Sequence, residues 1–312
     1  MSRYHPKISV CIPVYNHDVV MLVTALLQEV ANLPAGTVTI LVLDDASTNT
    51  FIKTNNRSFI KGCKNALYFE NATNSGRSKS RNKLAALADG DQLLFLDCDT
   101  LPSDNNFLKT YLENASPEKI VCGGIAYKSA PSDQRFMLRW KYGVNREERS
   151  VEARLLNPWK SFSSANFMVP SSYFEDHPFE EKLTQYGHED TLWGYALKKS
   201  NYSINHIQNP VYHLGIDTSE VFLSKTETSI KNLIKIWQIV NYDNQFKQDI
   251  QLLATASKLH KWHLHKLVYL LLKQLTPYIR KNLTSESPNL LLFDLFKLNV
   301  LLGTITLKKH LP

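Results

Sequence analysis

The sequence lacks the features that mark thiolate-metal, secreted or membrane-spanning proteins. Its 312 residues include four cysteines, and none forms a Cys-x-x-Cys pair, which argues against a zinc ribbon or a redox motif. No stretch reaches the roughly 18–20 apolar residues that span a bilayer. The first seven residues are polar and do not resemble a signal peptide. We therefore expect a cytoplasmic protein with reduced thiols, and peripheral attachment to the inner face of the cell membrane stays open.

Long runs of like charge are also absent, although the chain carries a formal net charge of +7. No segment resembles a nucleic-acid-binding module, so we expect no nucleic-acid partner. The positive charge leaves an anionic membrane surface or an anionic substrate as partners. With 43% hydrophobic and 21% charged residues, the chain has the composition of a folded domain rather than a disordered one.

The first hundred residues alternate between strand and helix patterns. Apolar runs predict strands over residues 8–13, 38–43, 66–70 and 92–96. Helical spacing or good helix formers predict helices over residues 19–31, 50–61 and 78–88. This alternation is typical of an α/β fold, with a mostly parallel, Rossmann-like sheet flanked by helices on both faces.

The remainder of the chain changes character twice. Between residues 120 and 215 we expect strands over 120–125, 163–169 and 204–213, a helix over 189–199, and a charged loop after the first of these strands. From about residue 220 the apolar residues follow helical spacing throughout. The predicted organisation is a catalytic domain over residues 1–218 and a helical C-terminal extension over residues 219–312.

Polar side chains follow three of the predicted strands, at the point where each strand ends. They are Tyr15 and Asn16, Asp44 and Asp45, and Asp97 with Asp99. In open parallel sheets, ligands bind outside the carboxyl ends of the strands. We therefore expect these side chains to converge on one binding site.

The triplet Asp97-Cys98-Asp99 has the chemistry of a cation site. Hard divalent cations such as Mg²⁺ and Mn²⁺ take carboxylate oxygens and bridge them to diphosphate oxygens. Two aspartates in a turn can equally be solvated surface acids, and the triplet alone does not decide. Its position directly after an apolar strand favours the metal interpretation.

Further motifs each admit two interpretations. Asp45 can accept a hydrogen bond from a nucleobase imide or can cap a helix. The basic loop from Asn74 to Asn82 contains Gly76 and Arg81, which can meet a diphosphate or form a solvated helix face. Glu189 and Asp190 begin a helix, where acids suit the helix dipole. Either could also serve as the general base for an acceptor hydroxyl. His213 is a metal ligand only if it reaches Asp99, and is otherwise a structural histidine.

The order of these motifs resembles the family 2 inverting glycosyltransferases, which have the GT-A fold. The resemblance is carried by residues 12–16, residues 43–48, Asn74-x-Gly76 with Arg81-Asn82, and residues 95–99. Residues 166–169 and 186–190 resemble the later half of that catalytic domain, which is shared with galactosyl- and N-acetylgalactosaminyl-transferases. Those relatives often have tryptophan and glycines where this chain has Gln185 to His188. The resemblance covers roughly residues 7–215.

The resemblance implies a role for each matching residue. It implies that Pro13 and Tyr15 line a uracil pocket, that Asp45 bonds the uracil ring, and that Asp190 is the catalytic base with Glu189 holding a sugar. It further implies a metal site of Asp99 and His213, with Asp97 at the metal or at the ribose. The donor-binding set expected from the motifs is Pro13, Tyr15, Asn16, Asp45, Asn74, Gly76, Arg81 and Asp97.

The implied function is inverting, Mn²⁺- or Mg²⁺-dependent transfer of a sugar from a UDP-sugar. Galactose, N-acetylgalactosamine or N-acetylglucosamine would move to a hydroxyl of a glycan or lipid-linked acceptor, in surface polysaccharide synthesis. One alternative is a nucleotidyltransferase with a related sheet, although residues 13–17 are not the glycine-rich loop with lysine that such enzymes carry. Another is an inactive sugar-nucleotide-binding scaffold protein.

The helical extension is a separate question. Residues 258–266 mix lysine, histidine, tryptophan and leucine, a composition that suits a membrane surface where lipid-linked acceptors lie. The same helices equally fit an appendage that packs on the catalytic domain or on a second subunit of a homo-oligomer. The sequence leaves both interpretations open.

Overall fold

The computed structural model describes residues 6–183 and 185–308, so most of the polar start of the chain lies outside the described residues. The chain forms two compact units. We call residues 6–128, 147–183 and 189–215 the sheet unit, and residues 129–146, 185–188 and 216–308 the helical unit. The boundary after residue 215 lies near the expected one at 218, but two segments that we assigned to the catalytic domain belong to the helical unit.

The sheet unit is built on a seven-stranded sheet with strand order β3-β2-β1-β4-β8-β6-β9. Its strands are β1 (Ile8–Val14), β2 (Val38–Asp44), β3 (Ala66–Glu70), β4 (Gln92–Leu96), β6 (Lys119–Cys122), β8 (Asn166–Pro170) and β9 (Ser203–His206). All pairs are parallel except those of β8, which runs antiparallel to β4 and β6. This mostly parallel sheet confirms the expected α/β fold.

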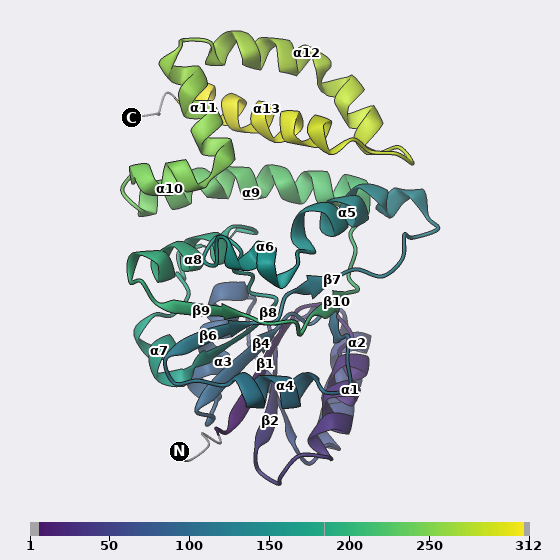
Figure 1. Ribbon diagram of the computed structural model, residues 1–312. Coiled ribbons are helices and arrows are strands. Elements are labelled where there is room, and N and C mark those ends of the chain that lie inside the picture. Colours follow the sequence, from purple (N-terminus) through teal and green to yellow (C-terminus); the bar gives the residue numbers. More distant parts are fainter. Residues whose placement is uncertain (1–5, 184, 309–312) are drawn as a thin grey trace. The chain divides into compact units, whose positions relative to one another are not determined.

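Helices cover both faces of this sheet (Figure 1). They are α1 (Val20–Val30), α2 (Thr50–Lys61) and α4 (Phe107–Asn114) on one face, and α3 (Arg77–Leu87), α7 (Ser171–Asp176) and α8 (Glu189–Lys199) on the other. Side chains alternate between the faces along each strand. Val10 and Ile12 accordingly join the core under α1, while Cys11 joins the core under α3. Apolar residues fill the core on both faces of the sheet. The ends of the strands are therefore the places where polar side chains can meet a ligand.

A second, three-stranded sheet has the order β5-β10-β7. Its strands are β5 (Thr100–Pro102), β7 (Ile125–Ala126) and β10 (Val211–His213). The continuous strand expected over residues 120–125 is therefore divided between β6 and β7, and that over 204–213 between β9 and β10. Gly123 lies at one break, where an added Cβ would stand 2.3 Å from the carbonyl oxygen of Asn209. Close approach of the two chain segments there ends both strands of the large sheet.

The charged segment after β7 is helical, whereas we expected a loop. It contains a 3-10 turn (Gln134–Phe136), α5 (Met137–Tyr142), a π-helical turn (Gly143–Glu147) and α6 (Val151–Leu155). Leu138 is fully buried in a cluster with Phe222 and Phe293, and this apolar packing favours helix formation in the first part of the segment. Arg154 is buried too, and donates to the carbonyl oxygens of Cys122 and Ile207. The high charge of the segment had led us to expect a solvated loop rather than these buried contacts.

Among the described residues, the helical unit contains five further helices, in the region where the apolar spacing predicted helical structure. They are α9 (Ser219–Ile239), α10 (Asn244–Asp249), α11 (Gln251–Lys261), α12 (His265–Leu283) and α13 (Leu290–Lys308). α13 contacts both α9 and α12 (Figure 1). Its Phe293 and Phe296 are buried in the apolar cluster of this unit. Within the described part of the chain, we find no helix with the length and apolar character needed to cross a membrane.

Candidate active site

The strand order places a topological switch point between β1 and β4. From β1 the chain adds β2 and then β3 on one side, and then returns to add β4 on the other side. Ligands of open α/β sheets bind at such a point, outside the carboxyl ends of the strands. Tyr15 and Asn16 follow β1 there, and Asp97 to Asp99 follow β4. The ring of Tyr15 is 46% exposed, so it is accessible to a ligand.

Asn16 joins the loop after β1 to the loop after β2. Its backbone N–H donates to Ser47 Oγ at 2.8 Å, and its Nδ2 donates to Thr48 Oγ1 at 2.9 Å. Its Oδ1 accepts from the backbone N–H of Asn49 at 2.9 Å. The φ angle of Asn16 is +52°, a value that asparagine tolerates better than most residues. The hydrogen bonds of Asn16 therefore hold the loop after β1 against the loop after β2.

Asp45 organises the loop before α3. Its Oδ1 accepts from Asn71 Nδ2 at 2.7 Å and from the backbone N–H of Ser75 at 2.9 Å, and its Oδ2 accepts from the N–H of Gly76 at 2.8 Å. Burial alone would raise the pKa of Asp45, but these donors outweigh it and lower the pKa. Asn74 Nδ2 donates to the backbone carbonyl of Asp45 at 3.2 Å. The carboxylate of Asp45 therefore already accepts several hydrogen bonds within the chain. The expected bond to a nucleobase would use a remaining lone pair of the same carboxylate.

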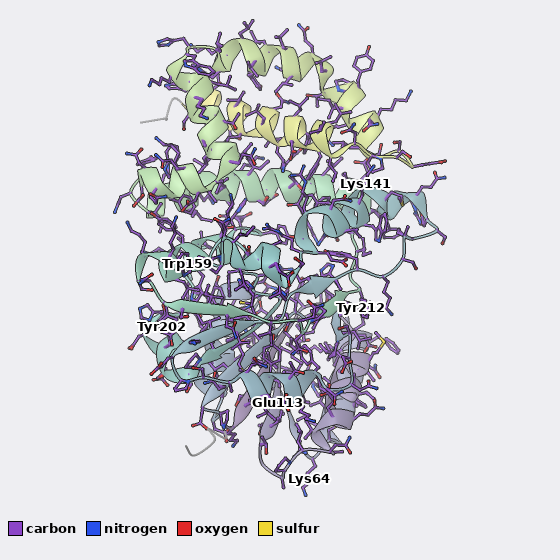
Figure 2. All side chains as sticks on the ribbon, in the orientation of Figure 1. Lys64, Glu113, Lys141, Trp159, Tyr202 and Tyr212 are labelled. Atoms are coloured by element: carbon purple, nitrogen blue, oxygen red, sulfur yellow. The ribbon has the colours of Figure 1, made fainter. Side chains whose placement is uncertain are left out.

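Asp99 and His213 meet because β5 and β10 pair. Thr100, directly after Asp99, is the antiparallel partner of His213 in that ladder. His213 Nε2 lies 3.4 Å from Asp99 Oδ2, and the backbone N–H of Leu214 donates to the carbonyl oxygen of Asp99 at 2.8 Å. Tyr212, labelled in Figure 2, precedes His213, and strand alternation directs its ring to the opposite face. Strand pairing thus brings together two residues that are far apart in the sequence.

The electrostatics around Asp99 keep it ionised. Burial would raise its pKa, but His213, and more distantly Arg77 and His17, lower it to about 2. Gly215 packs against this carboxylate so closely that an added Cβ would lie 2.5 Å from Asp99 Oδ2. Only glycine fits there without displacing the aspartate. Asp99 is therefore a negatively charged carboxylate that the chain holds in position from two sides.

α3 presents two arginines to the acids around the switch point. Arg77 and Arg81 are four residues apart and so lie on one side of the helix. Arg81 is almost wholly buried, and its Nη2 donates to Asp97 Oδ1 at 2.6 Å. Arg77 Nη1 lies 3.6 Å from Glu189 Oε1. Asp97 and Glu189 thus each have a cationic partner, and Arg81 is anchored by Asp97 rather than exposed on the surface.

Asp190 lies at the start of α8 with an unusual proton affinity. Burial is the main cause that raises its pKa, to about 7, and the adjacent Glu189 carboxylate adds to the effect, while Arg81 opposes it. Its Oδ1 accepts from the backbone N–H of Thr191 at 2.7 Å. A carboxylate with a pKa near neutrality can take a proton and release it again, as a general base must.

The residues expected to hold a metal are brought together only in part. Asp99 and His213 are adjacent, whereas Asp97 faces Arg81. Within the described ranges, no group of three or more His, Cys, Asp or Glu side chains is arranged to hold an ion. Cys98 packs against the core under α1, and burial raises the pKa of its thiol to about 12. Asp99 offers a carboxylate, which suits Mn²⁺ or Mg²⁺, and His213 adds an imidazole, a ligand of borderline transition metals.

Several supporting residues were not identified from the sequence. Asn71 and Ser75 hold Asp45, Ser47 and Thr48 hold Asn16, and Gly215 confines Asp99. Asn71 directly follows β3, so the strand-end pattern that identified Asp45 could also have identified it. Gly215 carried no such signal, because its importance arises from the β5–β10 pairing. Pro13 is the residue before the last in β1, and it lies opposite Leu43 of β2.

Comparison with proteins of known sequence agrees with this architecture. The family model for glycosyl transferase family 2 matches residues 9–177. Over 105 residues, 33% of this chain, the sequence is 34% identical to the cellulose synthase catalytic subunit (UDP-forming) of Xanthomonas axonopodis pv. citri (strain 306). That match spans only 13% of the cellulose synthase subunit.

Solved structures share the fold at low sequence identity. The mannosyltransferase PcManGT from Pyrobaculum calidifontis, in complex with GDP-Man and Mn²⁺, has a TM-score of 0.57 at 12% identity, covering 99% of this chain and 89% of that one. GalNAc-T7 with UDP, GalNAc and Mn²⁺ has a TM-score of 0.54 at 15% identity, covering 76% of this chain and 48% of that one. These likenesses show the GT-A fold. With more than half of its length matched by the family model, the chain belongs to glycosyl transferase family 2.

Proposed function

We propose that this chain is an inverting glycosyltransferase that depends on a divalent metal, with UDP-sugar as donor and a hydroxyl of a glycan or lipid-linked molecule as acceptor. The observation that carries the proposal is the β5–β10 pairing, which sets His213 Nε2 3.4 Å from Asp99 Oδ2 at the switch point. That separation is long for a hydrogen bond. Two ligands of one cation commonly lie about this far apart, as bond lengths near 2 Å imply.

Asp99 and His213 would hold Mn²⁺ or Mg²⁺, with diphosphate and water oxygens at the other positions. Such an ion neutralises the negative charge that develops on a departing diphosphate. Asp97 stays a donor-binding residue in this proposal, since its carboxylate is already paired with Arg81. Arg81 keeps Nε and Nη1 without hydrogen-bond partners among the described residues, which supports its expected role near the diphosphate.

Asp190 is the proposed base. Its carboxylate takes the proton of the acceptor hydroxyl while the hydroxyl oxygen forms a bond to the anomeric carbon of the sugar. The bond from that carbon to the diphosphate oxygen breaks, and its electron pair leaves with UDP. The raised pKa of Asp190 supports this role, because a base is most effective when its pKa lies near the working pH. Glu189, beside Arg77, is proposed to position the transferred sugar.

The nature of the donor and the setting follow from the resemblance rather than from the geometry. Tyr15 and Pro13 are proposed to line a uracil pocket. Asn16, Asn74 and Gly76 are proposed to lie beside it, and Asp45 is proposed to bond the uracil ring. UDP is supported by the description of the cellulose synthase relative as UDP-forming. Galactose, N-acetylgalactosamine and N-acetylglucosamine are the proposed sugars. The proposed setting is surface polysaccharide synthesis on the cytoplasmic side of the membrane.

A donor screen tests the proposal. UDP- and GDP-sugars are incubated with the chain and Mn²⁺, Mg²⁺ or EDTA, and release of the nucleoside diphosphate is measured. We expect release from a UDP-sugar only with a divalent ion, and loss of release in Asp99→Asn but not in Asp89→Asn, which changes an exposed aspartate elsewhere. Undiminished release in EDTA would overturn the metal site, and release from GDP-sugars alone would overturn the donor assignment. No release from any donor would favour an inactive binding protein.

A further inference from the structure

α12 exposes a row of large apolar side chains. Leu267, Leu271, Leu275 and Tyr278 are 55%, 53%, 50% and 74% exposed. Their separations of four, four and three residues place them on one side of a helix. A neighbouring side of α12 is already occupied, because Ile279 and Leu283 are buried with Phe293 of α13. The exposed row is therefore additional to what the core of the helical unit requires.

Two further large apolar residues are exposed in the turn directly before α12. Trp262 is 62% exposed and Leu264 is 42% exposed. We call the surface formed by Trp262, Leu264, Leu267, Leu270, Leu271, Leu275 and Tyr278 the α12 face. Single exposed apolar residues are normal on a protein surface, but a contiguous patch of this kind marks a site of association.

The charges beside the α12 face indicate its partner. Residues 250–285 contain no aspartate or glutamate. The same stretch carries six cationic side chains, namely Lys258, Lys261, Lys266, Lys273, Arg280 and Lys281. Of these, Arg280 is paired with Glu227 of α9, and the lysines on α12 are exposed. A second copy docked on this face would bring cations against cations, whereas an anionic lipid surface would complement them.

We propose that the α12 face docks on an anionic lipid surface, with α12 lying in the plane of the interface. Apolar side chains would enter the boundary between headgroups and acyl chains, and the lysines would meet lipid phosphates. Trp262 and Tyr278, near the two ends of the row, have the amphipathic rings that favour this depth. The proposal does not depend on donor chemistry, so the failure of one does not imply failure of the other.

Vesicle partition of the full chain tests the proposal. Co-sedimentation is measured with phosphatidylcholine vesicles, with and without phosphatidylglycerol, at low and high salt. The test variant is Leu267→Gln/Leu271→Gln/Leu275→Gln, which keeps helix propensity. The matched control is Leu291→Gln, which changes a leucine of α13 that is 70% exposed and lies outside the α12 face. Circular dichroism and nucleoside diphosphate release without vesicles verify that each variant is folded.

We expect the chain and the control to bind vesicles that contain phosphatidylglycerol, more weakly at high salt, and the triple variant to lose about a hundredfold in partition. Brominated acyl chains should quench the fluorescence of the chain less in Trp262→Phe. Equal partition of the triple variant and the parent chain would overturn the proposal, as would equal binding to both kinds of vesicle. A dimer in solution that the triple variant abolishes, with no vesicle binding, would assign the α12 face to a second copy.

Discussion

At the scale of single residues, Asp99 and Asp190 show how two carboxylates of one site differ through their surroundings. Asp99 faces His213 and has its pKa lowered to about 2, whereas Asp190 is partly buried beside Glu189 and has its pKa raised. The first remains an anion under all physiological conditions and suits a cation. The second exchanges a proton near neutrality and suits base catalysis.

Replacing Asp190 by asparagine should remove the base while preserving the donor site. We expect kcat for sugar transfer to fall by about a hundredfold or more. UDP affinity in the presence of Mn²⁺, measured by calorimetry, should change little. A variant with unchanged kcat would show that another group takes the acceptor proton.

The raised pKa of Asp190 also predicts a pH profile. The base works only when ionised, so lowering the pH through its pKa removes activity, and the raised pKa moves this loss from acidic pH to near pH 7. We expect kcat/KM to decrease tenfold per pH unit below that point. If the acid limb instead lay near the ordinary pKa of aspartate, the base would have to be a more exposed carboxylate.

Gly215 gives a third test at this scale. An added methyl group would collide with Asp99 Oδ2, so Gly215→Ala should displace the aspartate. We expect the Mn²⁺ concentration for half-maximal UDP release to rise by about tenfold or more, as is typical when the support of a metal ligand is disturbed. Gly62→Ala is a suitable control, because its added Cβ would meet one atom at an ordinary 3.4 Å. An unaltered Mn²⁺ requirement would argue against Asp99 as a ligand.

At the scale of secondary-structure elements, Glu29 links α1 to α4. Its Oε2 accepts from the backbone N–H of Leu108 at 2.8 Å, and burial is the main cause that raises its pKa to about 7. Because the folded state binds this proton more tightly than the unfolded state, the resulting stability is complete at acidic pH and is lost as the pH rises through about 7.

Glu29→Gln should therefore stabilise the chain selectively at alkaline pH. The amide still accepts from Leu108 but cannot ionise, so the free energy of unfolding at about pH 8 should rise by on the order of 1 kcal/mol. At about pH 3.5, below the ordinary glutamate pKa of 4.5, the difference should vanish, since Glu29 is then protonated in both the folded and the unfolded state. Urea titration at the two pH values measures this, and an equal effect at both would refute the ionisation argument.

The elements of the first hundred residues could be predicted from the sequence because each is specified locally. The apolar run of β4 and the helical spacing of α1 lie within a few residues of their expected bounds. The elements after residue 120 depend on distant contacts. β10 exists as a separate strand because it pairs with β5 and β7, and α5 is stabilised by Leu138 packing on α9 and α13. Neither partner can be identified from a local pattern.

The site could be predicted to the same extent. The strand-end rule located Asp97, Asp99 and Asp45 because the end of a strand is a local signal. The pairing of Arg81 with Asp97 could not be derived in this way, because the basic loop predicted either a diphosphate contact or a solvated helix face. The partner of a buried polar side chain depends on how distant segments pack, so it cannot be identified from a local motif.

At the scale of the whole molecule, ligand binding should appear as stability. A ligand that binds only the folded state raises the free energy of unfolding in proportion to the logarithm of its concentration, by about 2.7 kcal/mol at a hundredfold excess over Kd. We expect UDP with Mn²⁺ to raise the thermal midpoint, and Asp99→Asn to remove the Mn²⁺-dependent part. A midpoint indifferent to both ligands would contradict the proposed donor site.

The pairing of β5 with β10 has a consequence for synthesis of the chain on the ribosome. Asp99 emerges early, but His213 follows more than a hundred residues later, and the two meet only when β10 has joined β5. A nascent chain can therefore complete β1, β2 and β4 while its proposed cation site is still unfinished. If the metal is required, catalysis can begin only after the three-stranded sheet has formed. Activity of a newly made chain would therefore depend on the folding of β10.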